Sequence, residues 1–509
     1  MFCRTDIEDC GPPLPLNNPS IKKSAMGIKG FGKWLRGRYP SAFIPKSQFC
    51  QNIDEVYVEM NSLLHCTSRS VSTESHLQAL VLRHLKDINR RYRPLCKLFL
   101  ALDGPASLLK LAEQRKRRLD NGITAERTGL FDAQQFTPGC TFMWRFEQFL
   151  TDNASQMVES HRGLSTFHYI VSGASTLGEG ETKIFNEIAS SNHRTSSSAR
   201  KNARVIVTTD SDTMLHAIGH SIPHTYIVTP PWDHARSDAI FDVDRLLHLL
   251  LQESQRDLKQ TVHDFAFIVS LSGNDYLPSI QFGNYSTLWP HYCSLSGLQL
   301  IDLKTGSLNY DQFLSLLSSF MNSKAFDLHH GLQNAILDKA RSIPKETVER
   351  IRNFLVGVLA VTRQCTGTSN KVTISFNFSD TCAPSVGEFV EFFLDDSVSS
   401  LMEETATLSL IPQSPATLAI MLLEPNTRNL KYFPPPIRNL VLEYNGRANE
   451  FATDRDAKEW LDQQLAAMNK SKLPQEDLGC LLQRPSIIKI FSPHRPKTPQ
   501  RPGIGRPHS

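Results

Sequence analysis

Short apolar runs alternate with amphipathic stretches from about residue 26 to residue 290. The strand-like runs include 56–58, 99–102 and 205–207, and stretches with helical spacing lie between such runs. This alternation is typical of a parallel sheet covered by helices. We therefore predict an α/β fold, with a mostly parallel central sheet flanked by helices and a smaller, mostly helical C-terminal region.

The rest of the chain divides by composition. Helical spacing recurs at 311–323, 345–361 and 452–469, whereas residues 1–25 are rich in turn-forming Gly, Pro and Asn. From Arg484 onward the chain holds six Lys or Arg, six Pro and no acid, which predicts disorder. The tail is either an import signal, a tether for RNA or an inert solvated end. The predicted domains are a disordered extension at 1–25, the α/β domain at 26–325, a helical continuation at 326–475 and a basic, Pro-rich disordered tail at 476–509.

Composition narrows the class of protein only slightly. The chain is 40% hydrophobic and 21% charged, and its net charge of +4 is too small to indicate a partner. No apolar run approaches the length of about 18 residues that a membrane span needs, and no secretory signal is apparent. The ten cysteines form no CxxC pair. We therefore expect reduced thiols and an intracellular protein, with nucleus and cytoplasm not distinguished.

Acidic residues give the chain its main chemical signal. Seven carboxylates lie in five short motifs, most of them at or just beyond the end of a strand-like run: Glu59, Asp103, Glu179, Glu181, Asp210, Asp212 and Asp275. Ligands bind at the carboxyl ends of strands in open α/β sheets, so the fold would gather these acids in one crevice.

Acids gathered in this way need cations to stay ionised, and Mg²⁺ prefers oxygen ligands. Two such ions about 3.5–4 Å apart are the usual device for cleaving phosphodiesters. The pattern therefore predicts a Mg²⁺-dependent nuclease. Taken singly, each acid is equally compatible with an exposed loop charge or a helix cap.

A basic helix is predicted directly after Asp103, with Ser107 as its N-cap and Asn121-Gly122 as its stop. Helical spacing places Lys110, Gln114, Arg117 and Arg118 on one face, where they can bind phosphate. Alone, such a face is more often a solvated surface, but its link to Asp103 favours phosphate binding. His65 follows Glu59 by six residues, and its chemistry alone indicates an ordinary structural histidine.

The order of these motifs resembles that of the XRN-type 5′→3′ exoribonucleases, within the flap-endonuclease and PIN-like nuclease superfamily. The resemblance is strong from 26 to about 325 and traceable to about 445. It is carried by the segments 26–35, 59–65, 103–118, 137–143, 178–184, 210–212 and 273–278.

The resemblance implies stepwise hydrolysis of single-stranded RNA from a 5′-monophosphate end, releasing nucleoside 5′-monophosphates, in RNA decay or processing. It implies that the seven carboxylates hold two Mg²⁺ ions, for which Mn²⁺ can substitute. It also assigns Lys110, Gln114, Arg117 and Arg118 to the pocket for the 5′ phosphate and His65 to stacking on the first base.

Three departures from the family pattern stand out. Glu59 replaces an Asp, and its extra methylene moves the carboxylate by about 1.5 Å. A segment carrying a base-stacking Trp has no clear match, because 365–384 offers only Phe376 and Phe378. Residues 1–25 precede the point at which family members usually begin.

These departures leave open a catalytically weakened RNA-binding protein with the same fold. A structure-specific DNA endonuclease of the flap type is a third alternative, which the Gln-Arg-x-Arg-Arg segment disfavours.

Overall fold

The computed structural model describes most of the chain between residues 28 and 491. The described residues are 28–106, 110–161, 164, 167–194, 203–230, 239–323, 344–367, 382–394, 414–423, 429–468, 473 and 488–491. The predicted extension at 1–25 lies outside these residues, as do Ser107, Phe376 and Phe378.

One mixed sheet forms the centre of the molecule, with the strand order β1-β7-β6-β5-β2-β3-β4-β8. Its five inner strands, from β6 to β4, are parallel, and the remaining strands pair antiparallel at the edges. The predicted α/β class with a mostly parallel sheet is therefore confirmed. The strands are β1 Phe43–Pro45, β2 Glu55–Glu59, β3 Lys97–Ala101, β4 His168–Ser172, β5 Arg204–Val207, β6 Thr225–Val228, β7 Ala239–Asp242 and β8 Ile488–Phe491.

Both faces of the sheet are buried. On β2, Val56 and Val58 belong to one hydrophobic core and Tyr57 to the other, because successive side chains of a strand point to opposite faces. On β5, Val205 and Val207 likewise oppose Ile206. Such runs, apolar on both faces, are typical of parallel strands covered by helices on each side.

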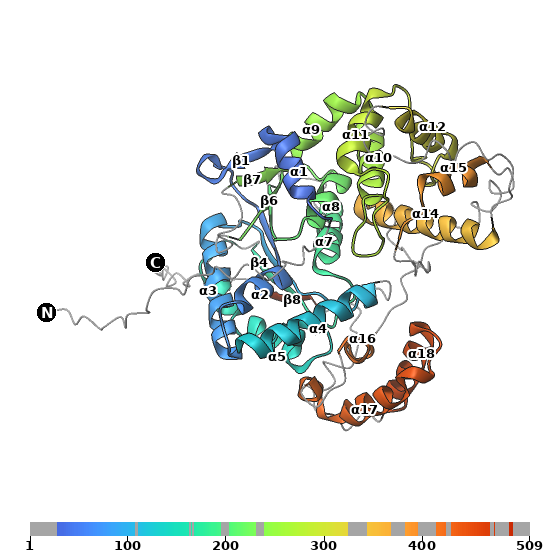
Figure 1. Cartoon of the computed structure of the whole chain (residues 1–509). Helices are drawn as coiled ribbons and strands as arrows, with labels where there is room; N and C mark the ends of the chain where they lie inside the picture. Colours follow the sequence, from blue (N-terminus) through green and yellow to red (C-terminus); the bar gives the residue numbers. More distant parts are fainter. Residues whose placement is uncertain are drawn as a thin grey trace, which may run out of the picture.

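Helices cover the two faces from different parts of the chain. Figure 1 shows α2, α3 and α5 on one side of the sheet and α8, α10 and α14 on the other. The helices of the main domain are α1 Phe31–Arg38, α2 Met60–Ser68, α3 Glu74–Tyr92, α4 Leu111–Thr128, α5 Thr141–Asp152, α6 Ala154–Glu159, α7 Gly180–Arg194, α8 Asp212–His220, α9 Val243–Ser254, α10 Leu258–Ser270, α11 Tyr285–Ser294 and α12 Tyr310–Met321. The later helices are α14 Lys345–Thr366, α15 Val386–Leu394, α16 Pro415–Leu422, α17 Arg438–Arg447 and α18 Asp454–Ala467.

The last three helices, α16 to α18, form a separate group at the bottom of Figure 1. Their hydrophobic core also includes Leu111, the first residue of α4, and Cys140, which precedes α5. The C-terminal helices therefore pack against the start of the predicted basic helix. None of the helices that the structure describes is long and apolar enough to cross a membrane.

The basic helix starts and ends later than predicted, and the N-cap residue of α4 is Lys110 and not Ser107. Helix α4 passes through Asn121-Gly122, ends at Thr128 and is capped by Gly129, whose φ is 67°. The predicted stop was wrong because one interior glycine costs a helix only about 1 kcal/mol, which tertiary contacts offset. Gly122 serves packing instead, since a Cβ there would lie 1.8 Å from Nε2 of Gln134.

The tail is not wholly irregular. Ile488–Phe491, within the segment predicted to be disordered, forms β8 and pairs antiparallel with β4. Composition averaged over the tail concealed this short run of β-branched and aromatic residues, which have high strand propensity. The rest of the tail lies outside the described residues.

One buried carboxylate of α10 joins this helix to α11 and to the segment at 300–301. Asp264 of α10 accepts hydrogen bonds from the backbone N–H groups of Leu300 and Ile301 (3.1 and 2.9 Å), from Nε2 of Gln260 (2.9 Å) and from the hydroxyl of Tyr292. It is fully buried.

We expect Asp264→Ala to lower the free energy of unfolding by about 3 kcal/mol, because several buried donors lose their acceptor. Asp264→Asn should also destabilise, since its amide N–H groups would face those donors. The exposed Asp311→Ala should cost less than about 1 kcal/mol. Urea titration measures all three, and an unchanged midpoint for both Asp264 variants would contradict this role.

Candidate active site

The parallel register brings predicted carboxylates together at the carboxyl ends of the inner strands. In β2, Val58 lies between Leu100 of β3 and Val207 of β5, so the three strands end side by side. Glu59 is the last residue of β2, and Asp103 and Asp210 follow β3 and β5 within three residues.

Helix starts and one loop supply the other four acids. Glu179 immediately precedes α7 and Glu181 lies in its first turn, while Asp212 begins α8. Asp275 lies in the loop after α10. The structure therefore brings all seven predicted carboxylates into one electrostatically linked group, as the pKa shifts show.

Burial and mutual repulsion disturb the ionisation of this group. Burial, followed by repulsion from Asp210 and Asp103, raises the pKa of Glu59 to about 8. Burial and the charge of Glu179 raise the pKa of Asp103 to about 6. The same causes raise the pKa values of Glu181, Asp210 and Asp212. The buried group therefore takes up protons more readily than free carboxylates do, and bound cations would favour its ionised form.

Hydrogen bonds fix the direction of several carboxylates. Asp103 Oδ1 accepts from the backbone N–H of Gly180 (2.7 Å), and its own N–H donates to Oδ1 of Asn61 (3.0 Å). Asp212 Oδ1 accepts from the N–H of Ile28 (2.7 Å). Asp210 Oδ1 accepts from the N–H of Asp212 (3.0 Å). The start of α7, the start of α8 and the first described residue therefore converge on the acids.

Glu59 has an environment fitted to its length. Its Oε2 accepts from Oγ of Ser62 (2.9 Å) and from Oγ1 of Thr208. Gly180 leaves room for the side chain, because a Cβ there would lie 2.9 Å from Cγ of Glu59. Sequence reasoning missed Ser62 and Thr208, since small hydroxyl residues carry no distinctive spacing.

Lys110, which directly precedes α4, and Arg117 of α4 reach into the acidic group. Nζ of Lys110 lies 2.7 Å from Oε2 of Glu179 and 3.6 Å from Oδ2 of Asp275. Nη2 of Arg117 lies 2.7 Å from Oδ1 of Asp275. Burial alone would raise the pKa of Asp275, but Lys110 and Arg117 outweigh it and lower the value.

The other members of the predicted phosphate face lie beside these cations. Arg118 donates from Nε to Oγ1 of Thr137 (2.7 Å), which fixes its guanidinium next to the site. Oε1 of Gln114 is buried and has no hydrogen-bond partner among the described residues. A buried, unmatched polar atom on this face is compatible with a polar ligand.

His65 lies in α2, with its ring edge-on to Phe136 at a centroid distance of 5.0 Å. Burial, followed by the nearby charge of Arg118, lowers the pKa of His65 to about 3. The imidazole is therefore neutral and lies close to the basic face of α4. The substitutes suggested for a stacking Trp, Phe376 and Phe378, lie outside the described residues.

The donor set suits a hard divalent cation in kind. All seven acids offer oxygen ligands, which Mg²⁺ prefers, and their charge exceeds that of the basic groups beside them. Within the described part of the chain, no three acidic, histidine or cysteine side chains are gathered closely enough to hold a metal ion. Lys110 and Arg117 instead pair with the carboxylates.

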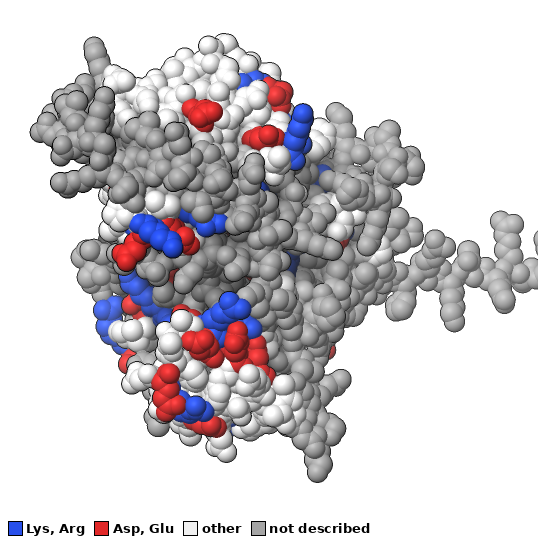
Figure 2. Space-filling view, turned by 90° about the vertical axis from the view of Figure 1, so that its right-hand side faces the viewer, with Lys and Arg blue, Asp and Glu red and all other residues white. Residues whose placement is uncertain are grey.

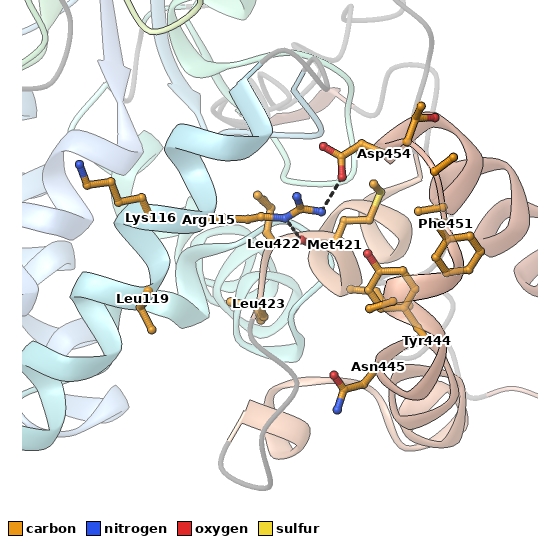
Figure 3. A pocket seen from close by; sticks show the side chains of 15 residues that line it. Arg115, Lys116, Leu119, Met421, Leu422, Leu423, Tyr444, Asn445, Phe451 and Asp454 are labelled. Atoms are coloured by element: carbon orange, nitrogen blue, oxygen red, sulfur yellow. Dashed lines mark hydrogen bonds and ion pairs between the residues drawn. The ribbon is translucent and has the colours of Figure 1, made fainter. Parts of the chain in front are cut away.

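The opposite side of α4 borders a groove of about 670 Å³ shared with the C-terminal helices. Figure 3 shows Arg115 donating to the carbonyl of Met421 (2.7 Å) and pairing with Asp454 (2.9 Å). Helix α4 is therefore held from behind by α16 and α18. On the face shown in Figure 2, the described basic and acidic side chains lie interspersed, so no single sign of charge dominates there.

Part of this chain is similar in sequence to known 5′-3′ exoribonucleases. The family model described as the XRN 5′-3′ exonuclease N-terminus matches residues 26–129 and 120–230. The 5′-3′ exoribonuclease 1 of Schizosaccharomyces pombe is 27% identical over 302 residues, covering 50% of this chain and 22% of that protein. The human 5′-3′ exoribonuclease 1 is 27% identical over 187 residues, covering 32% of this chain and 11% of its own length.

This chain thus spans about a fifth or less of these two relatives. Among solved structures, the catalytic core of Rad2 in complex with DNA aligns at 13% identity and a TM-score of 0.34, covering 73% of this chain and 98% of that one. The matches to the family model and to the exoribonucleases confirm that this chain resembles the XRN-type 5′→3′ exoribonuclease family, with residues 26–230 matching its N-terminal region.

Proposed function

We propose that this chain is a Mg²⁺-dependent 5′→3′ exoribonuclease that shortens 5′-monophosphorylated RNA and releases nucleoside 5′-monophosphates. The observation that supports it best is one group of seven acids into which Lys110, just before α4, and Arg117 of α4 project. Acids that need cations and basic groups suited to phosphate then lie within one site. The similarity to exoribonucleases supports RNA as the substrate.

Two bound Mg²⁺ ions would activate a water molecule and stabilise the departing oxygen. The chain's own residues would hold the ions and orient the groups that react. Glu59, Asp103, Glu179, Glu181, Asp210, Asp212 and Asp275 would hold the ions. Ser62, Thr208 and the N–H of Gly180 would keep Glu59 and Asp103 aimed at them.

Lys110 and Arg117 would exchange partners when substrate binds. In the structure they neutralise Glu179 and Asp275, whereas a terminal 5′ phosphate offers stronger acceptors in a geometry that suits an Arg fork. Gln114 and Arg118 would bind the same phosphate from the next turns of α4. His65, neutral and close to Arg118, would stack on the first base without reading its identity.

The central test uses the full chain with 5′-labelled RNA that carries a 5′ monophosphate. We expect release of the labelled mononucleotide in Mg²⁺ and none after chelation. Asp210→Ala should slow turnover about a thousandfold, which corresponds to about 4 kcal/mol of transition-state stabilisation. Equal activity on 5′-hydroxyl RNA would contradict the proposal, and a preference for flapped DNA would favour a DNA endonuclease.

The assignment of the phosphate pocket has its own test. Arg118→Ala should reduce the preference for 5′-monophosphate over 5′-hydroxyl RNA about tenfold, because a charge-assisted hydrogen bond is lost. Lys116→Ala, on the same helix but lining the rear groove, is the matched control and should leave that preference unchanged. An Arg118→Ala protein with full discrimination would remove this residue from the pocket.

A catalytically weakened RNA-binding protein is the second candidate, motivated by Glu59 in place of Asp. The bonds from Ser62 and Thr208 argue instead for a site adapted to the longer side chain. We expect Glu59→Asp to lower the digestion rate about tenfold or more, since small misplacement of a catalytic group is costly. A large gain in rate would support the weakened protein.

A further inference from the structure

Lys183 is a buried lysine in the Gly178–Ile184 motif, and the proposed mechanism gives this lysine no role. It lies in the first turns of α7 and is only 6% exposed. Its Nζ donates to the carbonyl oxygen of Leu102 at 2.6 Å and to that of Gly173 at 2.8 Å. Burying an amine is costly, so its placement against two carbonyls calls for an explanation.

The two carbonyls lie at the carboxyl ends of neighbouring strands. Leu102 directly precedes Asp103, and Gly173 directly follows the last residue of β4. The N–H of Leu102 also donates to the carbonyl of Ser172 (3.0 Å), which extends the ladder between β3 and β4 by one step. Lys183 therefore joins β3 and β4 at their carboxyl ends, where the acids lie.

The same helix holds Asp103 from another direction. Gly180, three residues before Lys183, donates its N–H to Oδ1 of Asp103. A side chain could not replace the hydrogen of Gly104, because a Cβ there would lie 1.6 Å from the carbonyl oxygen of Thr176. The backbone around Asp103 is thus closely packed and has little freedom once Lys183 is in place.

Lys183 differs from Lys110 in what it binds. Lys110 pairs with Glu179 and lies near Asp275, two carboxylates that the proposed reaction uses. Both hydrogen bonds that Lys183 makes with described residues go to backbone carbonyls. Ligand entry would compete with the contacts of Lys110 but not with those of Lys183, and either protonation state of the amine has the two N–H donors required.

We propose that Lys183 is a positioning residue that joins the carboxyl ends of β3 and β4 as a clamp and so holds Asp103 and the start of α7 in place within the acidic group, where divalent cations would bind. This inference rests on the proposed function for its consequence, although the clamp itself is a property of the protein alone. The clamp acts through the backbone, so Lys183 need not touch RNA.

Lys97 provides a matched control within the same sheet. It is also a buried lysine, 8% exposed, and it is the first residue of β3, at the amino end of that strand. Its Nζ contacts Oε1 of Glu187 at 2.5 Å and Oγ of Ser191 at 2.6 Å. Lys97→Met and Lys183→Met therefore remove the same group from the two ends of one strand, and both should destabilise the fold.

The test compares the full-length wild type, Lys183→Met and Lys97→Met without RNA. Isothermal titration with Mn²⁺ should show a Kd raised about tenfold or more in Lys183→Met and changed less than twofold in Lys97→Met. Hydrogen exchange in the metal-free proteins should show faster exchange of the amides of 102–104 in Lys183→Met only. Lys183→Arg, which keeps N–H donors, should recover part of the affinity and covers the case in which the Met variant does not fold.

Wild-type affinity and unchanged exchange in Lys183→Met would overturn the clamp, as would equal losses of affinity in both Met variants. Failure of the proposed function has a different signature. In that case the wild type neither binds Mn²⁺ nor digests RNA, while the exchange experiment still decides whether Lys183 holds the ends of the two strands.

Discussion

The crowding of buried carboxylates at one sheet edge is the constraint on which the rest of the site depends. Burial and mutual repulsion raise the pKa values of Glu59, Asp103 and their neighbours, so these acids stay ionised only where cations lie beside them. In the structure Lys110 and Arg117 meet part of this need. A site balanced in this way is prepared for ligands that bring positive charge to the acids and negative charge to the basic helix.

The parallel sheet brings the acids together, and α4 places basic side chains on one side of them. Strands in register end side by side, which places residues far apart in sequence at one edge. Helix α4 then separates two environments. Its inner face carries the basic residues of the site, while Arg115 on the other side binds Met421 and Asp454 of the C-terminal helices. The position of the basic face thus depends on packing more than 300 residues away in sequence.

Sequence patterns predicted the strong features well. Runs such as Val56–Val58 and Val205–Val207 were apolar enough to indicate the sheet, and the acids that follow them influence one another's ionisation in the structure. Local signals with small energies were less reliable. Asn121-Gly122 suggested a helix end that tertiary packing overrides, and the short strand Ile488–Phe491 was hidden by the polar composition around it.

By itself the sequence determined the α/β class, the identity of the seven acids and the basic face of α4, because each is encoded in local periodicity or in a motif. Only the tertiary structure decided which groups touch. The pairing of Lys110 with Glu179, the bonds of Ser62 and Thr208 to Glu59 and the grip of Lys183 on two strand ends all join separate segments. Periodicity reports the direction of a side chain relative to its own helix or strand, whereas contact depends on how distant elements pack.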